Sequence, residues 1–143
     1  MKAIATTEAP AAIGPYSQAI TTGNLIFLSG QIALDPAKKT MISEEPGFAE
    51  RANAAKGGAV ALETEQVMKN LEAVLRAAGA SFKCVARTTI YLSSMADFPI
   101  VNEIYGRYFE GITPPARATV QVAGLPRGAL VEIDAVAVMD HLV

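Results

Sequence analysis

The stretch that decides the fold is PPARATVQV, residues 114–122, which is followed after a Gly- and Pro-containing turn by LVEIDAV, residues 130–136. In both segments polar and apolar residues alternate with the two-residue period of a β-strand. Arg117 and Thr119 share the polar face of the first strand, and Glu132 belongs to the polar face of the second. We interpret the two strands as a hairpin that brings the Arg117 guanidinium close to the Glu132 carboxylate. Such a pair is suited to recognising a small carboxylate.

Two helices are predicted before these strands. Apolar residues at helical spacing predict a helix over residues 64–78 that Gly79 ends. A second apolar face, rich in aromatic residues, predicts another helix within residues 98–109, and we interpret these aromatic residues as core. The β-branched residues between the two helices predict a strand over residues 84–92.

The N-terminal half is predicted to contain a further hairpin. Two hydrophobic segments, residues 11–20 and 24–34, flank a short turn, and one more strand is expected at residues 2–6. From residue 35 to about residue 62 the pattern is replaced by Pro, Gly, Lys and Glu, which indicates a long surface connection. One short helix is expected there, near residues 48–55.

This order of elements predicts a single α+β domain over residues 1–143, an antiparallel-rich sheet with two helices packed on one face. The other face is expected to carry Arg117, Thr119 and Glu132. The hydrophobic fraction of 51% is high for a monomer of this length. We therefore expect a second copy of the chain to cover that face, which puts the polar groups at a subunit boundary.

Several classes of site and partner are disfavoured by composition. The single cysteine, Cys84, excludes an intramolecular disulfide, and the single histidine, His141, argues against a Ser-His-Asp relay or a histidine pair for zinc. No metal site is expected. A net charge of −2 without a basic cluster argues against nucleic acid. No apolar run reaches the roughly 18 residues that a membrane span needs, and no signal peptide is evident, so a cytoplasmic protein is expected.

Five short motifs resemble one known family. The motifs are IGPYSQA at 13–19, LSGQI at 28–32, VNEIY at 101–105, PAR at 115–117 and VEI at 131–133. Together they look like the Rid family (RidA or YjgF type) of enamine/imine deaminases. The resemblance covers nearly the whole chain apart from about residues 36–62, a connection that looks unusually long for the family.

The resemblance implies a fold, an assembly and an activity. The fold would be chorismate-mutase-like, assembled as a homotrimer with three clefts between subunits. The activity would be hydrolysis of 2-aminoacrylate and related 2-imino acids to 2-oxo acids and ammonia, without a cofactor. By motif position Arg117 would bind the substrate carboxylate and Glu132 would position the water. Other cleft positions would be those of Tyr16, Ser29, Gly30 and Asn102.

The residue types suit these roles. The planar fork of Arg117 can donate two parallel hydrogen bonds to a carboxylate, although pairing with Glu132 across the hairpin is an equal alternative from the pattern alone. Glu132 can accept from a water, and we favour this over strong base catalysis because a nearby Arg117 would oppose a rise in its pKa. Its alternative is an outward carboxylate on an edge strand. Tyr16 can bond the water or the substrate nitrogen, or can be an amphipathic core residue.

Four positions support weaker interpretations. Ser29 and Thr119 offer hydroxyl groups, with strand packing as the alternative. Thr119 stands where the deaminase branch frequently has cysteine, which leaves specificity open. Gly30 permits close approach of a ligand or forms a β-bulge. Asn102 is an amide in a helix and is suited to contacting a neighbouring chain.

The function expected from these observations is cofactor-independent imine hydrolysis. An imine is already electrophilic, so positioning and electrostatic stabilisation suffice without a covalent nucleophile. Two alternatives stay open. One is an RNA-directed endoribonuclease or translation inhibitor, and the other is a non-catalytic trimer that binds small carboxylates.

Overall fold

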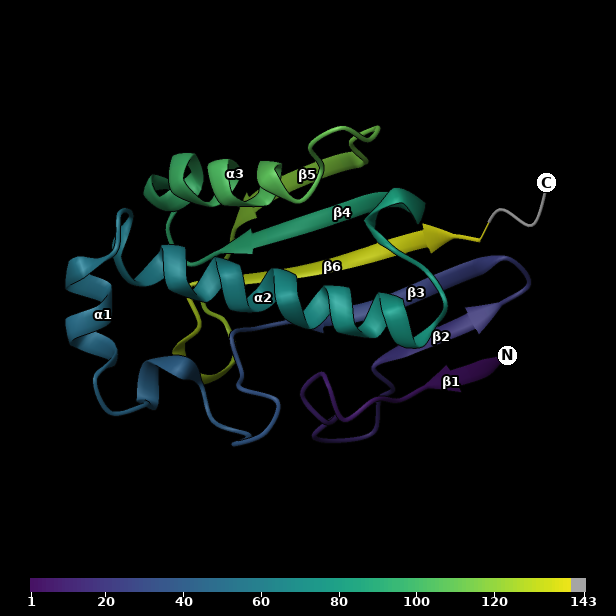
Figure 1. Ribbon diagram of the computed structural model, residues 1–143, viewed down its shortest axis with the longest axis horizontal. Coiled ribbons are helices and arrows are strands. Elements are labelled where there is room, and N and C mark those ends of the chain that lie inside the picture. Colours follow the sequence, from purple (N-terminus) through teal and green to yellow (C-terminus); the bar gives the residue numbers. More distant parts are fainter. Residues whose placement is uncertain (140–143) are drawn as a thin grey trace.

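A computed structural model describes residues 1–139, so His141 lies outside the described residues. This part of the chain folds into one mixed sheet with helices against one face, which confirms the α+β class (Figure 1). The strands are β1 Lys2–Ile4, β2 Ala19–Thr22, β3 Leu25–Gln31, β4 Val85–Leu92, β5 Ala116–Gln121 and β6 Val131–Val138. The α-helices are α1 Phe48–Ala54, α2 Gly58–Ala77 and α3 Phe98–Arg107. Short 3₁₀ turns are η1 Ile42–Glu44, η2 Phe82–Cys84, η3 Met95–Asp97 and η4 Pro126–Gly128.

The strand order β1-β2-β3-β6-β4-β5 differs from the prediction at the C-terminal end. The predicted hairpin of β5 and β6 is wrong, because β4 lies between them and pairs with β5 in parallel. Helix α3 forms the crossover that parallel pairing requires. Strand β6 then takes a central position, where its residues Val131 and Ile133 are fully buried. Burial of these side chains favours the centre of the sheet over its edge.

The register fixes which face each polar residue occupies. Arg117 on β5 pairs with Thr88 on β4, and Thr88 is buried against α3. Arg117 and Thr119 therefore lie on the helix-covered side of the sheet. Glu132 pairs with Tyr91 and lies on the opposite side, which we call the uncovered face. The expectation that all three share the uncovered face is correct for Glu132 and wrong for Arg117 and Thr119.

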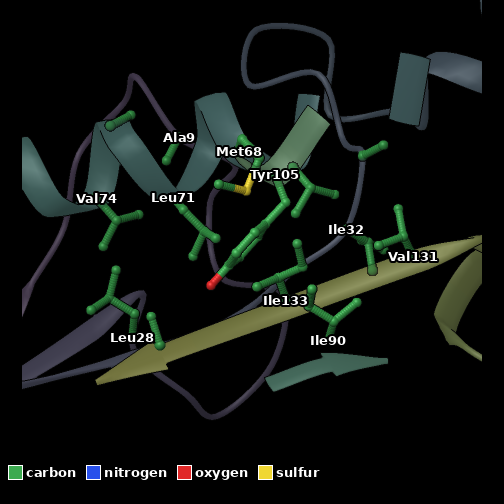
Figure 2. Packing of buried hydrophobic residues seen from close by; sticks show 14 of the residues in the cluster. Ala9, Leu28, Ile32, Met68, Leu71, Val74, Ile90, Tyr105, Val131 and Ile133 are labelled. Carbon is green, nitrogen blue, oxygen red and sulfur yellow. The ribbon is translucent and has the colours of Figure 1, made fainter. Parts of the chain in front are cut away.

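Helix α2 supplies much of the core. Met68, Leu71 and Val74 point from α2 toward Ile133 and its neighbours on the sheet, with the ring of Tyr105 close by (Figure 2). Each large side chain buried in this way contributes roughly 1.5–3 kcal/mol. The helix starts at Gly58, six residues before its predicted start at residue 64.

The N-terminal half follows the prediction with two differences. The hairpin of β2 and β3 and the strand β1 are confirmed, but β2 overlaps the predicted segment 11–20 only at its last two residues and continues to Thr22, inside the predicted turn. Helix α1 confirms the short helix expected near residues 48–55. The connection around it is not confined to the surface, because Met41, Ile42 and Phe48 are buried and anchor it to the core. Whether its length is unusual for the family stays a prediction.

Candidate functional site on two faces of the sheet

Arg117 is exposed at the sheet edge but is held in one orientation. Its Nη1 donates a 2.7 Å hydrogen bond to Oδ1 of Asn102 on α3. Its guanidinium carbon lies 5.4 Å from the ring centre of Phe98 and 5.1 Å from that of Tyr105, which is cation–π distance. No ion pair within residues 1–139 involves Arg117. The guanidinium thus presents hydrogen-bond donors to a hollow, and no carboxylate of the described residues lies within ion-pair distance of it.

Strand β4 and helix α3 together build the support under Arg117. The hydroxyl groups of Thr88 and Tyr105 share a buried 2.7 Å hydrogen bond that fixes the tyrosine ring. Asn102 and Tyr105 are three residues apart on α3, so they lie on the same side of the helix. The hollow beside Arg117 has a volume of about 480 Å³, and its walls include Gly106 and Pro115. Thr119 is half-buried two residues further along β5.

Glu132 lies on the uncovered face, directly over Gly30. A Cβ added to Gly30 would lie 3.0 Å from Cδ of Glu132, so only glycine leaves space for this carboxyl group. The pairing of β3 with β6 shifts register between Leu28 and Gln31, which makes Gly30 part of a β-bulge as well. The β-bulge interpretation of Gly30 therefore has support in the fold. The group that lies against Gly30 is the Glu132 carboxyl, and close approach of a ligand stays a prediction.

The environment of Glu132 changes its acidity. Burial is the main cause that raises the pKa of the half-buried Glu132 carboxyl, and the charge of Asp134 raises it further. Within its own chain Arg117 does not oppose this rise, because it lies on the other side of the sheet. The expected weakening of Glu132 as a base by a nearby Arg117 is thus absent from a single chain.

Tyr16 and Ser29 lie on the side of Glu132. Ser29 lies in β3 on the uncovered face, and its Oγ donates a 2.6 Å hydrogen bond to the carbonyl of Ser17. Tyr16, next to Ser17, is 52% exposed, and its hydroxyl accepts a hydrogen bond from the Ile13 amide at 3.3 Å. The alternative of a core role for Tyr16 does not fit this exposure.

The seven predicted residues therefore form two groups rather than one. Arg117, Asn102 and Thr119 lie on the helix-covered side, and the others lie on or beside the uncovered face: Glu132, Gly30, Ser29 and Tyr16. The Arg117 and Glu132 backbones are two strand spacings and three residues apart, about 14 Å for ideal strands. The predicted pairing of Arg117 with Glu132 does not form within one chain.

Sequence reasoning missed four neighbours of these residues as parts of the site. Phe98 and Tyr105 lie under the guanidinium, although the helical spacing indicated only core packing. Tyr91 donates a 3.1 Å hydrogen bond to Oδ2 of Asp134, beside Glu132. Asp134 could have been found, because it shares the two-residue period of Glu132.

Two further findings concern the described residues only. Within residues 1–139 no three His, Cys, Asp or Glu side chains are grouped so that they could hold a metal ion. None of the helices in this range is long and apolar enough to span a membrane. The cytoplasmic location expected from the sequence stays a prediction.

Comparison with known proteins now places the chain in a family. The sequence model of the Endoribonuclease L-PSP family matches residues 6–139. Protein DfrA of Myxococcus xanthus is 53% identical over 139 residues, which cover 96% of this chain and 95% of that protein. A protein of Mus musculus named 2-iminobutanoate/2-iminopropanoate deaminase is 48% identical over 142 residues, 99% of this chain and 94% of that one. The crystal structure of E. coli TdcF with bound serine has a TM-score of 0.84 and 33% sequence identity. The similarity covers 98% of this chain and 100% of the TdcF chain.

These similarities extend over nearly the whole length of each protein, so they apply to the complete α+β domain. The chain belongs to the Rid family, whose members include proteins named imine deaminases.

Proposed function

We propose that the protein is a cofactor-independent hydrolytic deaminase that converts 2-aminoacrylate and related 2-imino acids to 2-oxo acids and ammonia. The observation that carries the proposal is the Arg117 guanidinium, which Asn102 and two aromatic rings orient while it has no acidic partner in residues 1–139. A bidentate bond from this group to a carboxylate would contribute about 1.5–3 kcal/mol for each hydrogen bond.

The names of relatives support the same substrate class. Relatives from mouse and human that are 48% and 43% identical are named 2-iminobutanoate/2-iminopropanoate deaminase. The TdcF crystal structure contains bound serine. Serine has an α-carboxylate, the same group that Arg117 would bind in a 2-imino acid. DfrA has a different name, so the subtype of the activity belongs to this proposal.

In the proposed reaction Glu132 holds the attacking water. The carboxyl group accepts a hydrogen bond from the water, which attacks C2 of the protonated imine as the C=N π electrons move to nitrogen. The two protons of the water then pass from the oxygen to the nitrogen, which leaves with the C–N bonding pair, so the products are the 2-oxo acid and ammonia in its protonated form. Tyr16 and Ser29 offer hydroxyl groups on the same side of the sheet for the water or the nitrogen.

The site is proposed to be shared between chains of a homotrimer. Within one chain Arg117 and Glu132 lie on opposite sides of the sheet, too far apart to contact one small imino acid. A neighbouring chain that packs on the uncovered face would bring its own arginine toward Glu132. This face exposes apolar side chains, with Phe27 at 45% and Val120 at 41% exposure, and such surface favours association.

A coupled assay tests the activity. A dehydratase that generates 2-aminoacrylate is mixed with the purified protein, and pyruvate release is followed. The wild type should speed release, and Arg117→Ala should not. The matched control is Arg107→Ala, because Arg107 is an exposed arginine of α3 that pairs with Glu103 instead of facing the hollow. Equal rates with and without wild-type protein would exclude the proposal.

A mixing experiment tests the shared site. Arg117→Ala and Glu132→Gln chains are denatured together, refolded and assayed, with each variant refolded alone as the control. If each site takes its arginine from one chain and its glutamate from another, about a quarter of the sites regain both groups in an equal mixture. A mixture as inactive as either variant alone would show that sites are not shared.

The two alternatives give different outcomes in the same experiments. RNA cleavage that survives purification and disappears in Arg117→Ala would favour an endoribonuclease, which the family's description suggests but the net charge of −2 does not. Tight binding of 2-oxo acids without faster pyruvate release would favour a non-catalytic carboxylate-binding protein.

A further inference from the structure

Glu132 has a second carboxyl group beside it on the uncovered face. Glu132 and Asp134 are two residues apart on β6, so both side chains leave the same side of the strand, roughly 6–7 Å apart. Both residues are half-buried. A negative charge this close on a partly buried surface makes the ionisation of Glu132 less favourable.

Tyr91 fixes the second carboxyl group. Its side chain lies on the same face, since Tyr91 pairs directly with Glu132 in the register of β4 and β6. Its hydroxyl donates to Oδ2 of Asp134 at 3.1 Å, diagonally across the two strands. Asp134 is therefore anchored as a hydrogen-bond acceptor rather than left to turn toward solvent.

We propose that Asp134, anchored by Tyr91, is a positioning residue whose negative charge makes Glu132 exchange protons with the substrate rather than only hold the water. The inference rests on the proposed function and deepens it. Asp134 itself would touch neither substrate nor water.

The surrounding charges favour this role. On the uncovered face β3 presents Ser29 and Phe27 toward β6, and β5 presents Val120, so neither adds a charge there. Arg87 of β4 is exposed and pairs with Val136, further from Glu132 than Asp134 is. Tyr91 is itself a titratable group on this face, next to Glu132, and Tyr16 is another on this side. In the proposed trimer Arg117 of a neighbouring chain would draw the pKa of Glu132 down, and Asp134 would counteract it.

The direction of the Glu132 shift agrees with the geometry. Burial raises the pKa of the Glu132 carboxyl first, and the charge of Asp134 adds to the rise. A carboxyl group titrating closer to neutral pH accepts and returns a proton more effectively than one with an ordinary pKa.

The proton exchange closes without another reactant. Glu132 takes a proton from the water as its oxygen bonds to C2 of the iminium, and the C=N π pair moves to nitrogen. The carboxyl group returns this proton to the amino nitrogen and then takes the proton of the new hydroxyl group while the C–N bond breaks. Nitrogen leaves with the bonding pair as ammonia, which removes the second proton as ammonium. The glutamate ends as it began.

The test is a direct titration of Glu132, which does not depend on activity. Carboxyl carbons are labelled with ¹³C and followed by NMR against pH, with Glu132→Gln used to assign the signal. In Asp134→Asn the Glu132 midpoint should fall by roughly 0.5–2 pH units, as expected for removal of a charge at this distance. The midpoint of the acid limb in the pH profile of kcat/KM should move to lower pH by the same amount.

The control is a second tyrosine-bound carboxyl group, that of Glu65. Glu65 accepts a 2.8 Å hydrogen bond from Tyr108, away from Glu132 at the helix layer, so Glu65→Gln should leave the Glu132 midpoint unchanged. Should Asp134→Asn fail to fold, Asp134→Thr removes the same charge, suits a strand and leaves Tyr91 a hydroxyl partner. The same fall is expected.

The outcomes separate this inference from the function on which it rests. An unchanged Glu132 midpoint in the Asp134 variants, or an equal fall in Glu65→Gln, would overturn the role of Asp134 even in an active enzyme. A shifted midpoint in a protein without turnover would support the charge coupling and reject the proposed reaction.

Discussion

Gly30 lies beneath the carboxyl group of Glu132, with no space between them for a side chain. A Cβ on Gly30 would lie 3.0 Å from Cδ and 3.2 Å from Cγ of Glu132. The glycine is needed for this contact and not for its backbone angle, because it is not among the glycines with positive φ. Its absent side chain therefore sets where the carboxyl group lies.

The first prediction concerns this contact. In Gly30→Ala the Glu132 side chain must move, and a displacement of about 1 Å should lower kcat/KM roughly 10- to 100-fold. The melting temperature should change by only a few degrees, since the backbone can accept alanine. Gly124→Ala is the matched control, because a Cβ there meets nothing within 4 Å. A Gly30→Ala enzyme with wild-type kinetics would contradict this placement of Glu132.

The second prediction concerns the orientation of Arg117. Asn102→Ala removes the 2.7 Å hydrogen bond that directs the guanidinium. KM should rise about tenfold while kcat changes little, because in the proposed reaction the arginine would bind the substrate carboxylate equally in the ground and transition states. Helix α3 should not lose stability, since alanine is the better helix former. Glu103→Ala, at the next exposed position of α3, should keep the wild-type KM, and a kcat loss in Asn102→Ala at constant KM would speak against the orienting role.

Local periodicity predicted most elements of this fold because it depends on neighbouring residues alone. The helical spacing around Val67 to Val74 and the alternation from Val131 to Val136 both survive in the structure. Long-range pairing was not predictable in the same way. Alternation shows that Arg117 and Thr119 share a face, but not which face the helices cover, and nothing local reveals that β6 lies between β3 and β4.

The candidate site was predicted by motif and not by geometry. The motifs identified residues of both groups. They included Gly30 and Asn102, although neither side chain can act as an acid or a base. They did not identify Asp134, because its proposed role depends on the hydrogen bond that Tyr91 of the neighbouring strand donates to it. A site divided between two faces of a sheet also cannot be recognised from one chain's alternation, because in the proposed trimer its parts would meet only between chains.

The third prediction concerns the bond beneath the guanidinium. Thr88→Val leaves the Tyr105 hydroxyl buried without this partner, which should cost about 1–3 kcal/mol of unfolding free energy. Adding Tyr105→Phe removes both polar groups, so the double variant should be less destabilised than the sum of the single ones. Because phenylalanine keeps a ring under Arg117, KM should stay near the wild-type value. Urea unfolding at one fixed protein concentration measures the unfolding free energies of the two single variants and the double variant. Strictly additive losses would contradict an energetic coupling between the two hydroxyl groups.

The fourth prediction concerns Glu63 of α2, which is 2% exposed and accepts a 3.0 Å hydrogen bond from the Leu130 amide just before β6. Burial raises the pKa of this carboxyl above its usual 4.5, the Leu130 bond opposes the rise, and Asp97 adds to it. The folded protein thus holds the proton to higher pH than the unfolded chain does. The stabilisation is complete below about pH 4.5 and is lost as the pH rises through the folded pKa.

Glu63→Gln isolates this contribution, because glutamine keeps a carbonyl acceptor for the Leu130 amide and cannot ionise. The unfolding free energy of the variant minus that of the wild type should therefore increase as the pH rises from roughly 4 to 8. Urea unfolding across this pH range measures the difference in unfolding free energy. The pH-dependent contribution of Glu132 cancels in this difference, because both proteins contain Glu132. Glu110→Gln, at an exposed position, should show a much smaller dependence. A constant difference for Glu63→Gln would mean that the carboxyl group of Glu63 titrates alike in the folded and unfolded chain. Burial of Glu63 next to the start of β6 would then not disfavour its ionised form.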